Sequence, residues 1–379
     1  MKILFSFEGG FPKMGYGGGH QILRGLARSL SRLGHDVRVV CGGSDEVEAA
    51  KEDPGVDYRF QDSSVVRFRG LATGIATLAA LASWKPHLVC SFTSEAAVVA
   101  PVCRVLGIPM TIYIGAPELL PIPFRKGLLN FKRGLGYLPQ RIGGAISQRV
   151  LTISDHTSRQ ATEVWGFPMH KVTAVGTGLD EAYVESKAPL YRRPPGEPLR
   201  LLSVGRIALA QKPLDLVAEG LASLDVPWSH WTIIGTGVDE SSLLRRLDDL
   251  GVSGRVRFVG FQRPTEVARL LSEHDLVLLP SRYESFFLTP FEAVCCGKMV
   301  VTNDVAEVRP LLGDSSLLVF ARDCSAESYR DAIRTAWERL EEGTSDDAKA
   351  AQVREKYSWQ VIALGFLDAV EELVKKRGV

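Results

Sequence analysis

Short apolar segments alternate with longer amphipathic segments along most of this chain of 379 residues. The amphipathic segment 18–33 places Leu23, Leu26 and Leu30 on one face of a predicted helix. Apolar segments on either side of it and beyond predict strands in the first half at 3–7, 37–41, 65–68, 87–92, 110–114, 149–153 and 172–175. Such alternation is typical of α/β domains with parallel sheets.

The alternation is interrupted by residues 186–198, where four prolines and a glycine remove any periodicity and indicate a linker. It then resumes, with strands predicted near 201–204, 231–234, 256–259, 276–279 and 299–302. We therefore predict two α/β domains. The first comprises residues 1–185 together with an amphipathic terminal helix within 359–379, and the second comprises 199–358.

Composition is that of an ordinary globular protein, with 45% hydrophobic and 23% charged residues. The net charge of +1 argues against a nucleic-acid-binding role for the molecule as a whole. No apolar run reaches transmembrane length, and the apolar start is too short for a signal peptide. The six cysteines lack metal-ligand spacing. We therefore expect reduced cysteines and a cytoplasmic location.

Two glutamates with seven residues between them surround the start of a predicted helix. Glu284 follows the apolar strand at 276–279, and Glu292 lies in the apolar segment after it. Carboxylates at the carboxyl end of a parallel strand face the crevice where open α/β sheets bind ligands, so they can accept hydrogen bonds from sugar hydroxyls. The alternative is structural, with Glu284 at the helix start and Glu292 on a solvated face.

Two basic residues, Arg206 and Lys212, lie in the loop between the strand at 201–204 and a helix expected to begin near Pro213. A diphosphate at such a position meets helix amides, a bidentate guanidinium and a compact ammonium. A leaving nucleotide diphosphate gains negative charge as a glycosidic bond breaks, so two cations there stabilise the transition state most. Two exposed basic side chains without function are the alternative interpretation.

Together these residues resemble the E-x7-E motif and the basic pair of retaining glycosyltransferases of family 4. The resemblance implies the GT-B fold: two Rossmann-like domains whose parallel sheets face a central cleft, with a C-terminal helix that crosses back to the first domain. It implies that Glu284 contacts the donor sugar and Glu292 the nucleotide ribose. Arg206 and Lys212 would bind the diphosphate.

The resemblance extends to further positions of the second half. Phe287 stands where the family usually has glycine, and with Leu288 and Thr289 it would present backbone amides to the donor. Gly235, in a V-G-x-G-like turn after a predicted strand, would let the backbone approach the nucleotide. Phe261 lies in the region that reads the base through backbone groups. A tight turn without a ligand is the alternative for Gly235.

A glycine-rich loop follows the first strand. Gly15, Gly17 and His20 do not match the dinucleotide fingerprint, since His20 stands where a third glycine is needed. The acidic residue expected after the second strand is also missing, which argues against a dehydrogenase. The resemblance instead implies that Gly17, Gly18 and Gly19 line the donor phosphate and the acceptor. His20 is a candidate for a polar contact there or an ordinary surface histidine.

The main departure from the family lies in the first domain. Many members have a histidine six residues beyond the proline of a Pro-apolar strand, where it helps to hold the donor sugar. Counting from Pro109, that position is Gly115. The role is therefore absent, or it is filled by Tyr113, Glu118 or His20. The resemblance is strong from residue 201 to 307 and over about the first 40 residues, and it is poor from about 44 to 149.

Residues 119–154 contain no acidic residue. Apolar residues are interleaved there with basic ones between 124 and 149, namely Arg125, Lys126, Lys132, Arg133, Arg141 and Arg149. A segment of this kind can lie on an anionic membrane surface or bind an anionic acceptor. The alternative is a helical excursion with a solvated basic face.

These observations lead to one interpretation: a metal-independent, retaining glycosyltransferase. No D-x-D sequence occurs in the chain, which fits neutralisation of the diphosphate by Arg206 and Lys212. We expect no cofactor, a UDP-sugar as donor with a GDP-sugar as the alternative, and an acceptor (a glycan, a lipid-linked or a small molecule) bound by the first domain.

Two other functions stay open. A catalytically silent nucleotide-sugar-binding protein or partner subunit is suggested by Gly115 and Phe287, and it would bind donor without releasing nucleotide diphosphate. A nucleotide-sugar 2-epimerase shares the two-domain architecture, but it would not call for the E-x7-E motif and is less favoured.

Overall fold

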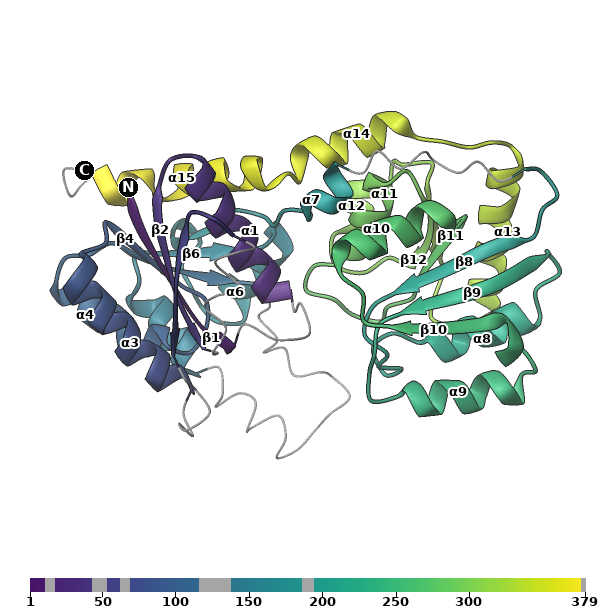
Figure 1. Ribbon diagram of the computed structural model, residues 1–379, viewed down its shortest axis with the longest axis horizontal. Coiled ribbons are helices and arrows are strands. Elements are labelled where there is room, and N and C mark those ends of the chain that lie inside the picture. The colour runs from purple at the N-terminus through teal and green to yellow at the C-terminus, as the bar shows by residue number, and fades with distance from the viewer. Residues whose placement is uncertain (11–17, 43–52, 62–68, 116–137, 186–193, 376–379) are drawn as a thin grey trace. The chain divides into compact units, whose positions relative to one another are not determined.

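The computed structural model in Figure 1 describes residues 1–10, 18–42, 53–61, 69–115, 138–185 and 194–375. The chain divides into two compact units, one of Met1–Gly178 with Trp359–Val379 and the other of Leu179–Ser358. Each unit is a parallel sheet covered by helices, so the predicted α/β class with two Rossmann-like domains is confirmed. The units divide after Gly178, whereas the sequence analysis set the end of the first domain at residue 185.

The sheet of the first unit has the strand order β3-β2-β1-β4-β5-β6-β7, and all neighbouring pairs are parallel. The strands are β1 (Lys2–Gly10), β2 (Asp36–Gly42), β3 (Val56–Gln61), β4 (Leu88–Ser91), β5 (Met110–Ile114), β6 (Arg149–Thr152) and β7 (Val172–Ala174). The strand predicted at 65–68 lies outside the described residues. The strand β3 was not predicted, because apolar and polar residues alternate in it and no apolar run marks it.

Helices cover this sheet, and Figure 1 shows α3 and α4 side by side. The helices of the first unit are α1 (Gly18–Arg32), α3 (Arg69–Trp84), α4 (Ala96–Val105), α6 (Asp155–Glu163), the 3-10 turn η1 (Met169–Lys171) and α15 (Trp359–Lys375). Leu23, Leu26 and Leu30 of α1 are fully buried, as their helical spacing predicts.

The terminal helix α15 packs against α1, so it belongs to the first unit as the sequence analysis expected. Its Phe366 ring lies 5.9 Å from the Phe5 ring of β1. At its start, the Trp359 indole lies over two glycines. A Cβ atom would lie 2.0 Å from the indole at Gly25 and 2.4 Å from it at Gly178, so both positions require glycine.

The sheet of the second unit has the order β10-β9-β8-β11-β12-β13, again parallel throughout. Its strands are β8 (Leu199–Val204), β9 (Trp228–Ile234), β10 (Val256–Gly260), β11 (Leu276–Leu279), β12 (Met299–Asn303) and β13 (Leu318–Ala321). The five strands predicted here are confirmed, and β13 is additional. The strand order reverses between β8 and β11, which is the switch point where open α/β sheets bind ligands.

The helices of the second unit enclose a continuous core around Trp231, whose indole N–H donates to the Ser203 hydroxyl at 2.9 Å. Among them α7, directly after Gly178, packs on α10 and α11, and α8 packs on α13. The helices are α7 (Glu181–Val184), α8 (Leu214–Ala222), α9 (Glu240–Asp249), η2 (Ser253–Arg255), α10 (Pro264–Glu273), α11 (Leu288–Cys295), α12 (Val308–Leu312), α13 (Ala326–Glu341) and α14 (Asp347–Lys356).

The cysteines and the helices bear on the expectations drawn from composition. All six cysteines are described, and none forms a disulfide. Among the described residues, no helix combines the length and the apolar character that a membrane span requires.

The contact between Trp359 and Gly25 leads to a stability prediction. The methyl group that Gly25→Ala adds would overlap the Trp359 indole, so we expect the variant to have a free energy of unfolding lower by about 1–3 kcal/mol. The control is Gly365→Ala in α15, where the added Cβ has only an ordinary contact at 3.9 Å. Both glycines are helical, so alanine improves helix propensity equally. Chemical denaturation measures both, and equal stabilities would show that the Trp359 contact does not hold α15.

Candidate functional site

The loops after β8 and β11 bring Lys212 and Glu284 together at the switch point of the second unit. The Lys212 Nζ donates to Glu284 Oε1 at 2.7 Å, and the two side chains are only 14% and 15% exposed. The Ser281 hydroxyl donates to the same carboxylate oxygen at 3.0 Å. A half-buried ion pair at this position can bind a ligand that carries both phosphate oxygens and hydroxyls.

The backbone of the β8 loop explains how Lys212 reaches this position. Gly205 has a φ of +144°, a conformation that residues with a side chain rarely adopt. A Cβ atom there would lie 3.3 Å from Cδ and Cε of Lys212, so the lysine stem crosses the bare glycine backbone. The neighbouring Gln211 side chain donates to the Tyr283 carbonyl at 3.1 Å and its own carbonyl accepts from the Arg282 amide at 2.9 Å. These bonds tie the two loops together.

Glu284 is held by buried residues that the sequence analysis missed. The Ser281 amide donates to Asn303 Oδ1 at 3.0 Å, and the Tyr329 hydroxyl donates to the same oxygen at 2.8 Å. Ser281, Asn303 and Tyr329 are all buried. The one available signal was Asn303 itself, a polar residue that ends the apolar run of β12.

Arg206 lies in the same loop as Lys212, but its side chain is exposed and does not form an ion pair with Glu284. Its Nη2 donates to the Gln211 side chain at 3.1 Å. The Arg206 guanidinium and the Lys212 ammonium therefore lie in one loop but bind different partners. The guanidinium can turn toward a ligand without breaking an ion pair among the described residues.

Glu292 of α11 is 7% exposed and differs sharply from Glu284 in its surroundings. Burial raises the pKa of its carboxyl to about 8, and the charge of Asp180 adds to the rise. Among the described residues, no hydrogen bond offsets this burial. A buried carboxyl without a partner is unusual in a folded protein. This carboxyl can therefore donate to and accept from a ligand hydroxyl.

The remaining candidates of the second unit lie around the same switch point. Phe287 is 2% exposed and stands directly before α11, which begins with Leu288 and Thr289. Gly235, with φ +131°, donates from its amide to the Gly260 carbonyl at 2.8 Å.

A Cβ atom at Gly235 would lie 2.0 Å from the Gly205 carbonyl, so this glycine is required for close packing of the strand ends whether or not a nucleotide approaches. Phe261, after β10, is 42% exposed.

The glycine-rich loop of the first unit is described only in part. Gly17 lies outside the described residues, whereas Gly18 and Gly19 are the first residues of α1. The His20 ring contacts the Phe7 ring edge to face at 4.8 Å. The structure therefore places two of the three candidate glycines at a helix start, where backbone amides are available to an anion.

Gly115, which stands where many family members have a histidine, directly follows β5. Of the proposed substitutes, Tyr113 is fully buried and its hydroxyl donates to the Gly176 carbonyl, so it serves the core. Glu118 lies outside the described residues.

Much of the basic segment 124–149 also lies outside them, including Arg125, Lys126, Lys132 and Arg133. Within its described part, Arg141 donates to the Trp165 carbonyl at 3.1 Å and Arg149 lies 4.0 Å from Glu372.

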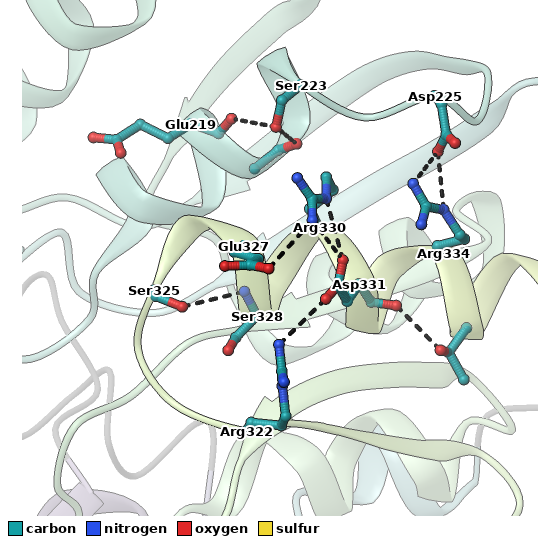
Figure 2. Close-up of polar contacts among 12 residues, drawn as sticks. Glu219, Ser223, Asp225, Arg322, Ser325, Glu327, Ser328, Arg330, Asp331 and Arg334 are labelled. Atoms are coloured by element: carbon teal, nitrogen blue, oxygen red, sulfur yellow. Dashed lines mark hydrogen bonds and ion pairs between the residues drawn. The ribbon is translucent and has the colours of Figure 1, made fainter.

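The second unit also contains a cavity of about 610 Å³ beside its edge strand β13. Arg309, Arg322 and Arg339 line it, and each has a partner within the protein. Figure 2 shows Arg322 and Arg330 directed at Asp331, at 3.3 and 2.9 Å. Arg339 donates to two backbone carbonyls of the edge. None of the predicted site residues lines this cavity, so we place the candidate site at the switch point.

Comparison with known proteins identifies two family matches that together span most of the chain. Residues 17–178 match the family described as glycosyl transferase 4-like domain, and residues 198–339 match the family described as glycosyl transferases group 1.

Glycogen synthase of Mycobacterium tuberculosis is 26% identical over 100% of this chain and 96% of its own length. D-inositol 3-phosphate glycosyltransferase of Mycobacterium bovis is 32% identical over 49% of this chain and 40% of its own. Among solved structures, Anabaena HepE in complex with UDP superposes with a TM-score of 0.74 at 16% identity, covering 98% of this chain and 100% of that one. At this identity the likeness shows the fold alone.

Glu292 leads to a prediction about pH. Its folded-state pKa of about 8 lies above the ordinary value of 4.5, so the folded protein holds this proton more tightly than the unfolded chain does. The free energy of unfolding therefore contains a contribution that is complete below about pH 4.5 and is lost as pH rises through about 8. Glu292→Gln removes it. We expect the variant to gain stability relative to the unaltered protein across this window and to level off above it.

Chemical denaturation at pH 5 to 9 checks this difference, with a slope of up to about 1.4 kcal/mol per pH unit. The control is Glu327→Gln, since the Glu327 side chain is 69% exposed on α13. A difference between Glu292→Gln and the unaltered protein that stays constant over the whole range would contradict the raised pKa.

Proposed function

We propose, from the premise that residues 17–178 match the glycosyl transferase 4-like domain and residues 198–339 match glycosyl transferases group 1, that the chain is a retaining, metal-independent enzyme of glycosyltransferase family 4. It would move a sugar from a nucleotide-diphosphate sugar to an acceptor hydroxyl. The observation that carries this proposal is the Lys212–Glu284 pair at the switch point of the second sheet, where a cation and a carboxylate lie within 2.7 Å.

The two members of the pair suit the two parts of such a donor. Lys212, joined by Arg206 from the same loop, would bind the diphosphate, while Glu284 would accept hydrogen bonds from the sugar hydroxyls. As the bond between the anomeric carbon and the phosphate oxygen breaks, the leaving diphosphate gains charge next to two cations. The acceptor oxygen forms the new bond on the same face of the sugar, and its proton passes to the leaving phosphate. Charge compensation by side chains supports independence from metal.

Glu292 supports the nucleotide half of the proposal. Its buried carboxyl has no hydrogen-bond partner among the described residues, and a pair of ribose hydroxyls would supply partners for both oxygens. The strand ends around Gly235, and Phe261 after β10, would then contact the base. We propose a UDP-sugar as donor, supported by the UDP complex of the similar HepE structure, with a GDP-sugar as the alternative.

The acceptor would bind to the first domain. We expect a glycan, a lipid-linked molecule or a small molecule, and the names of the relatives do not narrow this choice for the present chain. Contact of the segment 124–149 with an anionic membrane, and a cytoplasmic location, stay predictions.

A second candidate function is a nucleotide-sugar-binding protein without catalysis. The observations that favour it are Gly115 in place of the usual histidine and the bulky Phe287 beside Lys212. Such a protein would bind the donor at the same site and would never release nucleotide diphosphate.

One assay separates these functions. The purified protein is incubated with UDP-, GDP-, ADP- and dTDP-sugars in the presence of EDTA, and released nucleotide diphosphate is measured together with the thermal shift. Release with one donor establishes a metal-free transferase and identifies the donor. Stabilisation without release, also when candidate acceptors are added, supports the silent binder. If no donor causes release or stabilisation, the donor site is refuted.

Lys212 leads to a kinetic prediction. Lys212→Ala removes a cation that stabilises the leaving diphosphate, so we expect kcat to fall on the order of 10²-fold or more. The control is Lys349→Ala on α14, where a lysine that is 11% exposed pairs with the exposed Asp314. Steady-state kinetics on the identified donor measure both variants. Unchanged kcat in Lys212→Ala would refute the phosphate assignment.

Glu292 leads to a binding prediction. If its carboxyl holds the ribose, the unaltered protein binds UDP more tightly than 2′-deoxy-UDP, because the deoxy analogue leaves a buried polar group without a partner. We expect a factor of about 5 to 150. In Glu292→Ala this preference should disappear while the diphosphate contacts persist. Calorimetric titration of both nucleotides checks the ratio, and an unchanged preference in the variant would place the ribose elsewhere.

A further inference from the structure

The ring of Phe287 lies against the ammonium group of Lys212. The Lys212 Nζ is 4.3 Å from the centre of the ring, well within the range of a cation–π contact. The same ammonium binds Glu284 at 2.7 Å, and the lysine stem crosses the backbone of Gly205. Lys212 is therefore confined on three sides by a carboxylate, an aromatic face and a glycine backbone.

Phe287 is part of the buried core of the second unit, and its contact with the ammonium is additional to that packing. The neighbouring Phe286 ring stacks on Phe291 at 5.1 Å and approaches Tyr357 at 6.5 Å, so Phe286 is part of an aromatic cluster. Phe287 stands at the residue before α11, and its side chain cannot cap the helix by a hydrogen bond. Its ring is 2% exposed, so its contact with the ammonium is shielded from water.

We propose that Phe287 is a positioning residue for Lys212, and that it makes the site select the diphosphate part of the ligand. This inference rests on the proposed function, because it assumes that a nucleotide diphosphate binds at Lys212. A cation over an aromatic face is attracted in a defined position, and the attraction strengthens when water is excluded. The ring would therefore keep the ammonium in place when Glu284 turns from the lysine to the sugar.

This role differs from that of a small residue at the same position. Glycine leaves the ammonium with the carboxylate as its partner, so the lysine would follow Glu284 or move into solvent. With Phe287, the ammonium keeps a partner that does not compete for its hydrogen bonds. All of them are then available to phosphate oxygens, and the lysine stem loses less conformational freedom on binding.

The test compares the affinity for UDP with that for uridine, measured by calorimetric titration and by competition. Phe287→Leu keeps an apolar side chain of similar bulk and removes the aromatic face. We expect UDP to bind about 3- to 30-fold more weakly to this variant, while uridine binds as before. Phe287→Tyr keeps the face and should retain the UDP affinity. Phe286→Leu, which removes the adjacent ring, should leave the ratio of the two affinities unchanged.

A double-mutant cycle identifies the partner of the ring. In a Lys212→Met background no ammonium is present, so Phe287→Leu should no longer change the UDP affinity. Equal losses for UDP and uridine, an effect that persists without the lysine, or unchanged UDP binding in Phe287→Leu would each overturn the inference and leave the proposed function standing. If neither UDP nor GDP binds to the unaltered protein, the proposed function fails, and the inference fails with it.

Discussion

The ion pair between Lys212 and Glu284 is the interaction on which the candidate site depends. Two opposite charges that are only about 15% exposed cost much solvation energy, which they recover only if each keeps a partner. Breaking the pair by removing one member leaves the other charge without compensation. A donor that offers phosphate oxygens to the lysine and hydroxyls to the carboxylate can replace both partners at once. The pair is thus formed without ligand, and it suits the class of donor proposed above.

Much of the surrounding structure serves to hold these two side chains. Gly205 lets the lysine stem pass over the backbone, and Gly235 lets the ends of β8, β9 and β10 approach closely. On the other side, Asn303 and Tyr329 fix Ser281, which donates to Glu284. These supports come from backbone conformation and from buried hydrogen bonds, both of which resist displacement. The Lys212–Glu284 pair is therefore held in place before any ligand binds.

The two glutamates of the E-x7-E motif lie in different environments. Glu284 follows the carboxyl end of β11 and accepts hydrogen bonds from the Lys212 ammonium and the Ser281 hydroxyl. Glu292, eight residues later, lies inside α11 next to Asp180, where burial raises its pKa to about 8. A carboxylate in an ion pair and a buried carboxyl with a raised pKa therefore lie before and within the same helix. The raised pKa also links the stability of this unit to pH.

The sequence by itself determined the α/β class and five of the six strands of the second sheet, because buried parallel strands appear as apolar runs between helices. It missed β3, which alternates apolar with polar residues, and β13, although the apolar run of β13 is as long as that of β11. It also singled out Lys212 and Glu284, by their positions after predicted strands and by their resemblance to the basic pair and the E-x7-E motif of family 4.

Only the tertiary structure decided that these two residues touch, since a contact over 72 positions depends on β8 and β11 being neighbours. The support of Glu284 by Asn303 and Tyr329, and the contact of Phe287 with Lys212, were decided in the same way. A pattern along the chain reports which face of an element is buried. Which side chains meet across elements depends on strand order and packing.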